Sequence, residues 1–252
     1  RVAADQIHVM WPVLFAFHVG LARLLQEFGV EPAVIVGHSI GEVSAAHVAG
    51  ALSLDDAARV IAHQSRLVQK SVGKGIMLLA AIGWDESEPI AASSNGRIHR
   101  AIAASPKTTV FSGDAAALTA LGAQFASRGI FNRSVQTGAA VHGPQMEYLV
   151  DELPRQLIGL RPRTARIPII SSLSGKSIAG ENLDISYWSR QLSEPVRFAS
   201  AVQTLLDDEV NLLLEIAPHP IVKQSIEESI KASSLSEAVF AFATSWRNED
   251  EG

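Results

Sequence analysis

The chain contains no cysteine and no excess of positive charge, and each absence excludes a class of protein. Without cysteine, its 252 residues can form no disulfide, no thiolate nucleophile and no cysteine-ligated metal site. The net charge of −5 argues against a nucleic acid as the main partner. No apolar run approaches the length of a membrane span, and no signal peptide opens the chain. With 47% hydrophobic and 19% charged residues, the composition predicts an ordinary globular protein of the cytoplasm.

The length allows one large domain, or a large domain with a small insert, and either can bury a substantial core. Residues 9–25 form an apolar pattern at helical spacing almost at the start of the chain. A domain with an α/β core usually presents a strand before such a helix. We therefore expect that an N-terminal part of the domain is missing from this chain.

The most informative motif is Gly-His-Ser-Ile-Gly at residues 37–41. It fits the Gly-x-Ser-x-Gly elbow, in which a serine occupies a sharp turn between a strand and a helix. Residues 33–36 are apolar and β-branched, as in a buried parallel strand, and residues 42–50 are small and compatible with a helix. The glycines allow one backbone to approach another where a Cβ would clash. The context therefore predicts that Ser39 is a nucleophile.

The order of predicted elements indicates a mixed α/β fold with a small insert. After the elbow helix, Ser53 is expected to cap a helix that runs to about residue 69. Between residues 74 and 137 the order is β-α-β-β-α-β, which matches the ferredoxin-like motif. Its strands are expected at 76–82, 98–103, 108–112 and 131–137, and its helices at 85–93 and 115–127. After the insert, helices are expected at 142–160, 187–190, 196–206 and 221–231, and strands at 167–172, 210–216 and 239–244. The strand at 210–216 is predicted to be buried.

A serine hydroxyl needs a general base, and histidine is the usual one. His142 opens a loop where the insert rejoins the large domain, from which a side chain can reach a cleft. His219 stands between two prolines after a predicted core strand and is an equal competitor on spacing alone. His38 precedes the serine, and its ring could point either way. No Asp or Glu stands out as a third member, so a dyad oriented by backbone carbonyls is at least as plausible as a triad.

Six sequence blocks together resemble the acyltransferase domains of modular type I polyketide synthases and the related malonyl-CoA:acyl-carrier-protein transacylases. They follow the family's order along nearly the whole chain. The blocks are residues 11–16, 37–42, 48–59, 141–146, 187–188 with 195–198, and 215–220. The resemblance implies an α/β-hydrolase-like large subdomain of residues 1–73 and 138–252. Residues 74–137 would be the inserted ferredoxin-like small subdomain, with the active site between the two.

The resemblance also implies roles for particular residues. Ser39 would be the acylated nucleophile, His142 its general base, and the backbone N–H of Ile40 an oxyanion donor. The loop around His219 would orient the catalytic histidine through a backbone carbonyl. The family's second oxyanion donor lies in an N-terminal Pro-Gly-Gln-Gly segment that this chain lacks. No metal and no tightly bound cofactor are implied. The substrates would be acyl-CoA or the phosphopantetheine thioester of a carrier protein, and neighbouring synthase domains are expected partners.

The chain departs from the family at residues expected to line the substrate pocket, which also include His38. Extender-type members have an arginine at the position of Gln64, where it pairs with the carboxylate of malonyl or methylmalonyl groups. Arg66 cannot replace it, because two residues along a helix rotate a side chain by roughly 200°. A malonyl carboxylate would be buried without a countercharge, at a cost on the order of 3–5 kcal/mol. Gln64 therefore favours an uncharged acyl group.

Two other departures make the predicted pocket more apolar. Trp11 replaces a glutamine that is usual in the family. The segment Ala139, Ala140 and Val141 before His142 replaces larger or more polar residues. These changes fit enzymes that load starter units or move an acyl chain between carrier proteins.

Three alternatives remain open from the sequence. One is an ordinary malonyl or methylmalonyl extender-unit transferase, in which Gln64 reflects drift. A second is an editing hydrolase, which would form the same acyl-enzyme and resolve it with water. A third is a domain that has lost activity.

Overall fold

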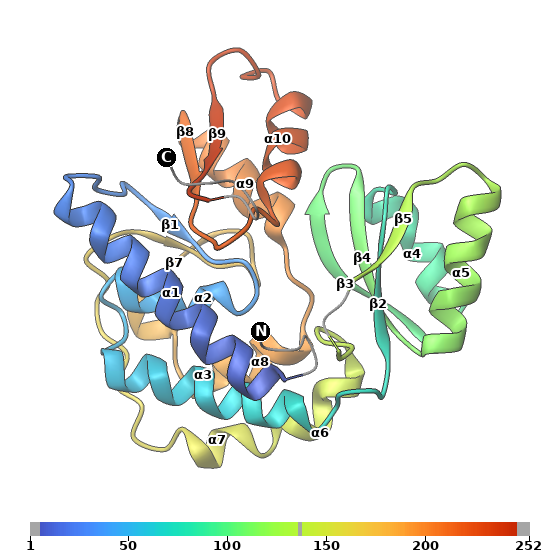
Figure 1. Cartoon of the computed structure of the whole chain (residues 1–252), viewed down its shortest axis with the longest axis horizontal. Coiled ribbons are helices and arrows are strands. Elements are labelled where there is room, and N and C mark those ends of the chain that lie inside the picture. Colours follow the sequence, from blue (N-terminus) through green and yellow to red (C-terminus); the bar gives the residue numbers. More distant parts are fainter. Residues whose placement is uncertain (1–5, 136–137, 246–252) are drawn as a thin grey trace.

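Helix α1 (Ile7–Glu27) runs along one side of the molecule and packs against α2 (Gly41–Val48) and α3 (Leu54–Gln69) (Figure 1). This computed structural model describes residues 6–135 and 138–245. Ile7, Trp11 and Phe15 recur every four residues on the buried face of α1, as helical periodicity predicts. Helix α3 begins where the sequence indicates, because the hydroxyl of Ser53 accepts a hydrogen bond from the backbone N–H of Asp56 at 3.0 Å.

The expectation that no segment could cross a membrane was wrong as regards length and composition. Over its 21 residues, α1 is long and apolar enough to do so. One such helix near the start of a chain is weak evidence, because the core helix of a globular protein passes the same test. Trp11 and Phe15 lie in the main hydrophobic core, so one face of α1 packs against protein.

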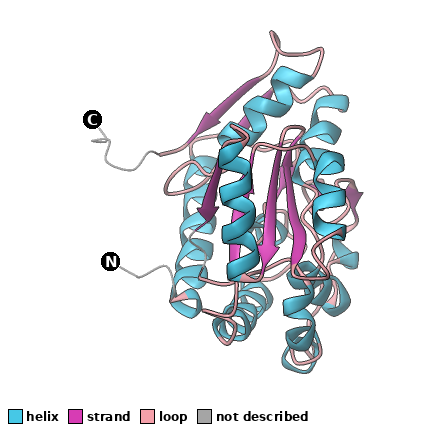
Figure 2. Ribbon diagram, turned by 90° about the vertical axis from the view of Figure 1, so that its right-hand side faces the viewer, coloured by secondary structure: helices cyan, strands magenta, loops and turns pink. Residues whose placement is uncertain are grey.

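The insert forms a four-stranded antiparallel sheet. Its elements are β2 (Ile76–Ala80), α4 (Trp84–Ala92), β3 (Ile98–Ser105), β4 (Thr108–Gly113), α5 (Ala115–Ser127) and β5 (Asn132–Val135). The strand order β3-β4-β2-β5 is the order that a ferredoxin-like motif produces. Figure 2 shows helices lying across the face of these strands. The predicted end of the last strand, at residues 136 and 137, lies outside the described residues.

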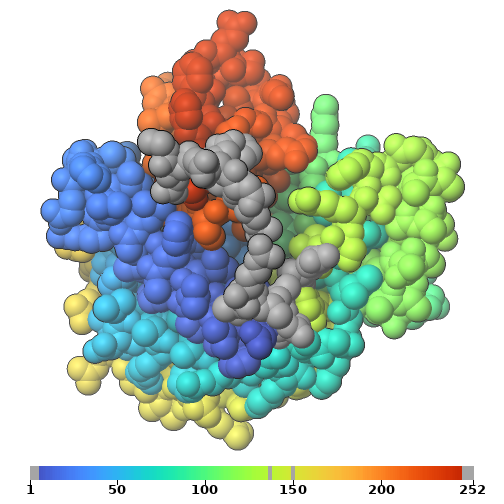
Figure 3. Space-filling model, in the orientation of Figure 1, coloured from blue at the N-terminus to red at the C-terminus, as the bar shows by residue number. Residues whose placement is uncertain are grey.

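The two faces of this sheet contact different cores. Leu78 and Phe111 pack with residues of α5 in a small cluster, whereas Met77 and Val110 belong to the main core. The backbone at Val196 also extends the sheet, because its N–H donates to Ala101 at 2.9 Å. The division into residues 74–137 and the remainder stays a prediction, since the main core draws on both parts. Figure 3 shows the insert (green) and helix α1 (blue) at opposite sides of one face of the molecule.

The rest of the chain builds two further sheets and the helices around them. Its first elements are β1 (Ile35–Val36), η1 (Pro144–Met146), α6 (Glu147–Val150), α7 (Leu153–Gln156), β6 (Ile169–Ile170), β7 (Ser177–Ile178) and η2 (Gly180–Asn182). They are followed by α8 (Ile185–Ser193), α9 (Phe198–Asp207), β8 (Leu212–Glu215), α10 (Lys223–Ala232) and β9 (Phe240–Ala243). Strand β1 pairs in parallel with β6, which pairs antiparallel with β7, and β8 pairs in parallel with β9. These helices together with parallel and antiparallel strands confirm the predicted α/β class.

Two expected elements were wrong in detail. The single helix at 142–160 is three short pieces, η1, α6 and α7. Pro154 lacks the N–H that would bond back into α6, which accounts for the break between α6 and α7. His142 lies outside them, with φ +58°. The strand expected to be buried is only half buried. Leu212 is 58% exposed while Leu213 is 7% exposed, because side chains alternate across a strand and the core covers one face.

Candidate active site

Ser39 lies in a sharp turn between β1 and α2. Its φ of +54° is in the left-handed region that side chains rarely adopt, so the chain reverses within a few residues. A Cβ on Gly37 would lie 2.3 Å from the Cα of Glu42, which leaves room only for glycine. A Cβ on Gly41 would meet nothing within 4 Å. The close approach that the motif predicts therefore occurs at the first glycine of the pair.

The fold brings His142 against Ser39, 103 residues away in the sequence. The Oγ atom of Ser39 lies 2.7 Å from Nε2 of His142, which is hydrogen-bond distance. His142 is 3% exposed, and its backbone N–H donates to the carbonyl of Leu192 at 3.1 Å. The histidine is therefore held against the C-terminal part of α8, with its ring toward the serine.

Burial keeps the imidazole of His142 neutral. It lowers the pKa of His142 from 6.5 to about 4, and the nearby His38 acts in the same direction. The backbone carbonyls of Glu194 and Gln191 favour the protonated ring and partly offset this lowering of the pKa. A neutral imidazole whose Nε2 accepts the serine proton is the form required of a general base.

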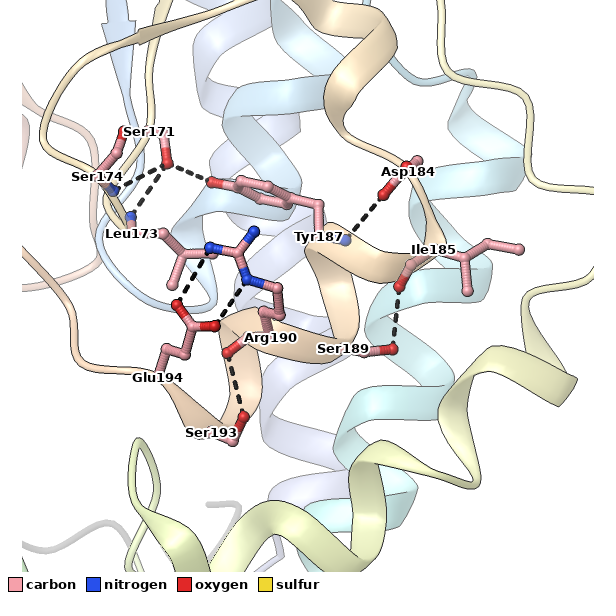
Figure 4. Close-up of polar contacts among 10 residues, drawn as sticks. All are labelled: Ser171, Leu173, Ser174, Asp184, Ile185, Tyr187, Ser189, Arg190, Ser193 and Glu194. Carbon is pink, nitrogen blue, oxygen red and sulfur yellow. Dashed lines mark hydrogen bonds and ion pairs between the residues drawn. The ribbon is translucent and has the colours of Figure 1, made fainter.

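No acid completes a triad among the described contacts of His142. Its Nδ1 atom is buried and makes no hydrogen bond within the described residues, although the carbonyls of Glu194 and Gln191 act on the ring. The carboxylate of Glu194 binds the guanidinium of Arg190, with distances of 2.7 and 3.2 Å (Figure 4). The carbonyls that act on the ring thus come from the end of α8 and the residue after it. The orienting role expected of the loop around His219 stays a prediction.

His38 directs its ring away from solvent toward α9. The ring packs edge-on against Phe198, with centroids 5.0 Å apart and an interplanar angle of 85°. Burial lowers the pKa of His38 to about 4. Because α9 begins at Phe198, this contact joins the nucleophile turn to the block segment 195–198.

The backbone N–H of Ile40 is available at the start of α2. The next two N–H groups, of Gly41 and Glu42, donate to the carbonyls of His38 and Ser39, each at 3.0 Å. Among the described backbone hydrogen bonds, none uses the N–H of Ile40. This geometry is compatible with the oxyanion role predicted for Ile40.

Gln64 is fully buried and reaches toward the nucleophile through another glutamine. Its Nε2 donates to the backbone carbonyl of Trp188 and to Oε1 of Gln191, each at 3.1 Å. Gln191 in turn donates from Nε2 to the carbonyl of Ser39 at 2.8 Å. Arg66 is exposed, as the helical rotation predicts, so it supplies no charge beside Gln64.

The other predicted pocket residues are buried, and Trp11, Ala139 and Val141 belong to the main hydrophobic core. Trp11, 9% exposed, lies in the main core from the side of α1. Ala139, Ala140 and Val141 are at most 7% exposed. Ala140 lines a small cavity of about 230 Å³, which is otherwise enclosed by Ser71, Lys74, Gln145, Met146 and Tyr148. The pocket role of these residues stays a prediction.

Sequence reasoning missed two supporting residues, Gln191 and Tyr187. The Tyr187 hydroxyl donates to the buried carboxylate of Glu42, which also accepts from the N–H and hydroxyl of Ser172 at 2.7 and 2.9 Å. Figure 4 shows the same tyrosine beside Ser171, at 2.7 Å. Burial raises the pKa of Glu42 to about 7, against the effect of these donors. Tyr187 lies in the block of residues 187–188, which was its available signal. Gln191 lies between that pair and residues 195–198, and no sequence block marked it.

Comparison with known proteins agrees with this geometry. The profile of the acyl transferase domain matches residues 2–251. Erythronolide synthase EryA2 from Saccharopolyspora erythraea is 40% identical over 233 residues, which are 92% of this chain and 6% of that protein. The chain therefore spans a small part of the length of the curated relatives it matches.

Solved structures of similar domains superpose closely on the fold. The acyltransferase domain from module 8 of the salinomycin polyketide synthase gives a TM-score of 0.94 at 38% identity, covering 97% of this chain and 57% of that one. A loading acyltransferase from the avermectin modular polyketide synthase gives 0.91 at 32% identity, covering 97% and 77%.

Fold and site thus define a serine-dependent acyltransferase. The chain belongs to the acyl transferase domain family, and its relatives are segments of polyketide synthases.

Proposed function

We propose that this domain transfers an acyl group from a thioester to the phosphopantetheine thiol of a carrier protein through an acyl-enzyme on Ser39. The observation that carries the proposal is the 2.7 Å contact between Ser39 Oγ and the neutral imidazole of His142. Nε2 takes the hydroxyl proton while Oγ bonds to the thioester carbonyl carbon. The tetrahedral intermediate then expels the donor thiolate, which receives that proton from the imidazolium.

The second half of the reaction repeats these steps with a thiol as nucleophile. The carrier-protein thiol gives its proton to His142 as its sulfur attacks the acyl carbon. Ser39 Oγ then leaves and recovers the proton. The N–H of Ile40 would bind the oxyanion in both halves, and the neutral His142 serves again without a change of charge between turnovers.

The relatives support a place in polyketide synthesis. The curated relative is a synthase of which this chain matches one segment, and the neighbouring solved structures are acyltransferase domains of polyketide synthases. The proposed partners are an acyl carrier protein and the adjoining synthase domains, such as a ketosynthase. The proposed location is the cytoplasm, where acyl-CoA is available as a donor.

The proposed acyl group is uncharged. Gln64 offers amide atoms where an extender-type enzyme would offer a guanidinium, and the nearest arginine on its helix, Arg66, is exposed. An unpaired malonyl carboxylate buried beside it would cost on the order of 3–5 kcal/mol, about a thousandfold in rate. The similar solved structures include both a loading acyltransferase and a domain from module 8 of a synthase, so the proposal rests on Gln64 and not on similarity.

Intact-mass spectrometry after incubation with a panel of acyl-CoA thioesters tests this function. Acetyl, isobutyryl and butyryl groups are expected to add to the protein and then to move to a carrier protein, whereas malonyl and methylmalonyl are not. Ser39→Ala is the control that must remain unmodified. Release of free acid in place of transfer would identify an editing hydrolase instead.

The variant Gln64→Arg separates the proposed substrate from an extender unit. It is expected to gain malonyl transfer and to lose the uncharged substrates, because the guanidinium supplies the missing countercharge. An unchanged preference would refute the assignment of Gln64 to substrate choice.

A further inference from the structure

The side chain of Glu42 joins three segments of the chain at the start of α2. Glu42 follows Ser39 by three residues and is 1% exposed. One of its carboxyl oxygens accepts from the backbone N–H of Ser172 at 2.7 Å and from the hydroxyl of Tyr187. The other oxygen accepts from the hydroxyl of Ser172 at 2.9 Å. Glu42 therefore ties the helix behind the nucleophile to α8 and to the segment that follows β6.

The direction of each hydrogen bond around the tyrosine is fixed. Tyr187 has one hydroxyl hydrogen, which it donates to Glu42, so the hydroxyl of Ser171 must donate to Tyr187 over 2.7 Å (Figure 4). Ser171 in turn accepts from the backbone N–H of Leu173 at 3.1 Å. This line of donors ends at the carboxyl group of Glu42. Removal of the carboxyl group would take away the acceptor that the tyrosine uses.

Helix α8 meets the nucleophile turn at a second point, one helical turn further along. Tyr187 and Gln191 lie on the same face of α8, because four residues complete about one turn. Gln191 donates from Nε2 to the carbonyl of Ser39 at 2.8 Å. The same carbonyl accepts from the backbone N–H of Glu42 at 3.0 Å. Two contacts on one face hold α8 in place, whereas a single contact would allow the helix to pivot.

The position of α8 matters because this helix also holds the general base. The carbonyl of Leu192 accepts from the backbone N–H of His142 at 3.1 Å. The carbonyls of Gln191 and Glu194 act on the ring of His142. A displacement of α8 relative to α2 would therefore change the 2.7 Å separation between Nε2 of His142 and Oγ of Ser39.

We propose that Glu42 is a positioning residue, which holds α8 against the nucleophile turn and so sets the distance between Ser39 and His142. This inference rests on the proposed function, in which these two residues are nucleophile and base. The role needs the hydrogen bonds of Glu42 and not its charge. A protonated carboxyl group can donate to the hydroxyl oxygen of Ser172 while its other oxygen still accepts from Tyr187. The side-chain amide of glutamine offers the same acceptor and a donor in the same place.

The reaction of Ser39 with a fluorophosphonate tests the proposal, because this probe reports an activated serine and requires no recognition of an acyl group. Its rate constant is measured on the intact protein at pH 7.5, together with kcat and KM for acylation by the acyl-CoA panel. Glu42→Ala should slow labelling by about tenfold to a hundredfold and lower kcat similarly, with KM changed by about twofold or less. Glu42→Gln should stay within about threefold of the wild type, because it keeps the hydrogen bonds.

A matched control removes a carboxylate that joins two other elements. Glu228 on α10 accepts from the hydroxyls of Ser105 and Thr108 at 2.5 and 2.9 Å, and none of its described hydrogen bonds reaches the dyad. Glu228→Ala should therefore leave the labelling rate within about twofold of the wild type. Urea unfolding shows which variants are folded.

A double-mutant cycle tests whether Glu42 acts through α8. Tyr187→Phe removes the contact of Glu42 with α8 and keeps its contacts with Ser172. Alone, this variant should slow labelling by about threefold or more. Added to Glu42→Ala, it should slow labelling by a further twofold or less, roughly, because both changes break the same contact.

Three results would overturn the inference. Folded Glu42→Ala that labels at the wild-type rate would show that the dyad keeps its geometry without this residue. Equal losses in Glu42→Gln and Glu42→Ala would assign the effect to charge. Fully additive losses in the cycle would separate Glu42 from α8. If Glu42→Ala fails to fold, the labelling rate of Tyr187→Phe decides, and a wild-type rate in that variant overturns the inference.

The same measurements separate this inference from the proposed function. Wild-type protein that reacts with the probe but takes no acyl group from any thioester would refute the proposed function and leave the role of Glu42 standing. Wild-type protein that does not react with the probe would refute both.

Discussion

The acid limb of the pH–rate profile should report the buried state of His142. An exposed histidine loses its basic form below about pH 6.5, but burial lowers the pKa of His142 to about 4. At pH 5 a base with a pKa of 6.5 would be about 3% active, whereas one with a pKa of 4 would be about 90% active. The difference in kcat/KM at this pH is therefore about thirtyfold.

Rapid-quench measurement of Ser39 acylation between pH 4 and 8 tests this expectation. Since kcat/KM reports ionisations of the free enzyme, the profile should be flat down to about pH 5 and half-maximal near pH 4. Protein returned to pH 7.5 after each incubation must recover full activity, which excludes acid unfolding as the cause of a decline. An inflection near pH 6.5 in such recoverable protein would refute the reasoning about burial.

The same pKa shift has a consequence for stability, and its sign follows from linkage. The unfolded chain protonates His142 near pH 6.5, whereas the folded protein resists protonation until about pH 4. The free energy of unfolding is therefore undiminished by this group above pH 6.5 and falls as the pH drops toward 4. The shift corresponds to about 3 kcal/mol at the acid end. Urea unfolding of the wild type and of His142→Ala at pH 7.5 and 5 would measure this group's share, because His38 and Glu42 also titrate in this range. A decline of equal size in both proteins would contradict the assignment to His142.

Three further substitutions test the architecture of the site. Gly37→Ala should abolish folding or lower the free energy of unfolding in urea by more than about 4 kcal/mol, because its Cβ would overlap the backbone of Glu42. Gly41→Ala has free space around its Cβ and should be neutral or stabilising. Equal effects of the two substitutions would contradict the close approach assigned to Gly37. Gln191→Leu should lower the free energy of unfolding by about 1–3 kcal/mol, because the carbonyl of Ser39 and an N–H of Gln64 lose their buried partner. In the folded variant kcat should fall about tenfold to a hundredfold, and an unchanged kcat would exclude a positioning role. Tyr187→Phe should destabilise the protein by about 1–3 kcal/mol, because it removes a hydrogen-bond donor from the carboxylate of Glu42. The loss should be larger at pH 8 than at pH 5, because the pKa of Glu42 is about 7 and the carboxylate is ionised at pH 8. A loss independent of pH would show that this carboxyl group stays neutral.

Local sequence signals were sufficient where one residue or a short period decides the conformation. The sequence predicted the elbow glycine, the cap at Ser53 and the order of strands and helices in the insert. Each depends on neighbours within a few residues. The helix expected at 142–160 failed for the opposite reason. The segment looked helical, but Pro154 removed a hydrogen bond that would join α7 to α6.

The sequence by itself determined that a serine lies in a sharp turn between a strand and a helix. Its lack of cysteine excluded a thiolate nucleophile, and its negative net charge argued against a nucleic acid as the main partner. It left His142 and His219 equal as bases on spacing alone, because no local pattern tells which loop returns to the serine. Only the tertiary structure placed His142 at 2.7 Å from Ser39 and set its pKa by burial. Only packing also revealed Gln191, whose contacts reach 127 and 152 residues back along the chain. Such long-range hydrogen bonds depend on how helices α3 and α8 pack together, and no short window of sequence contains that information.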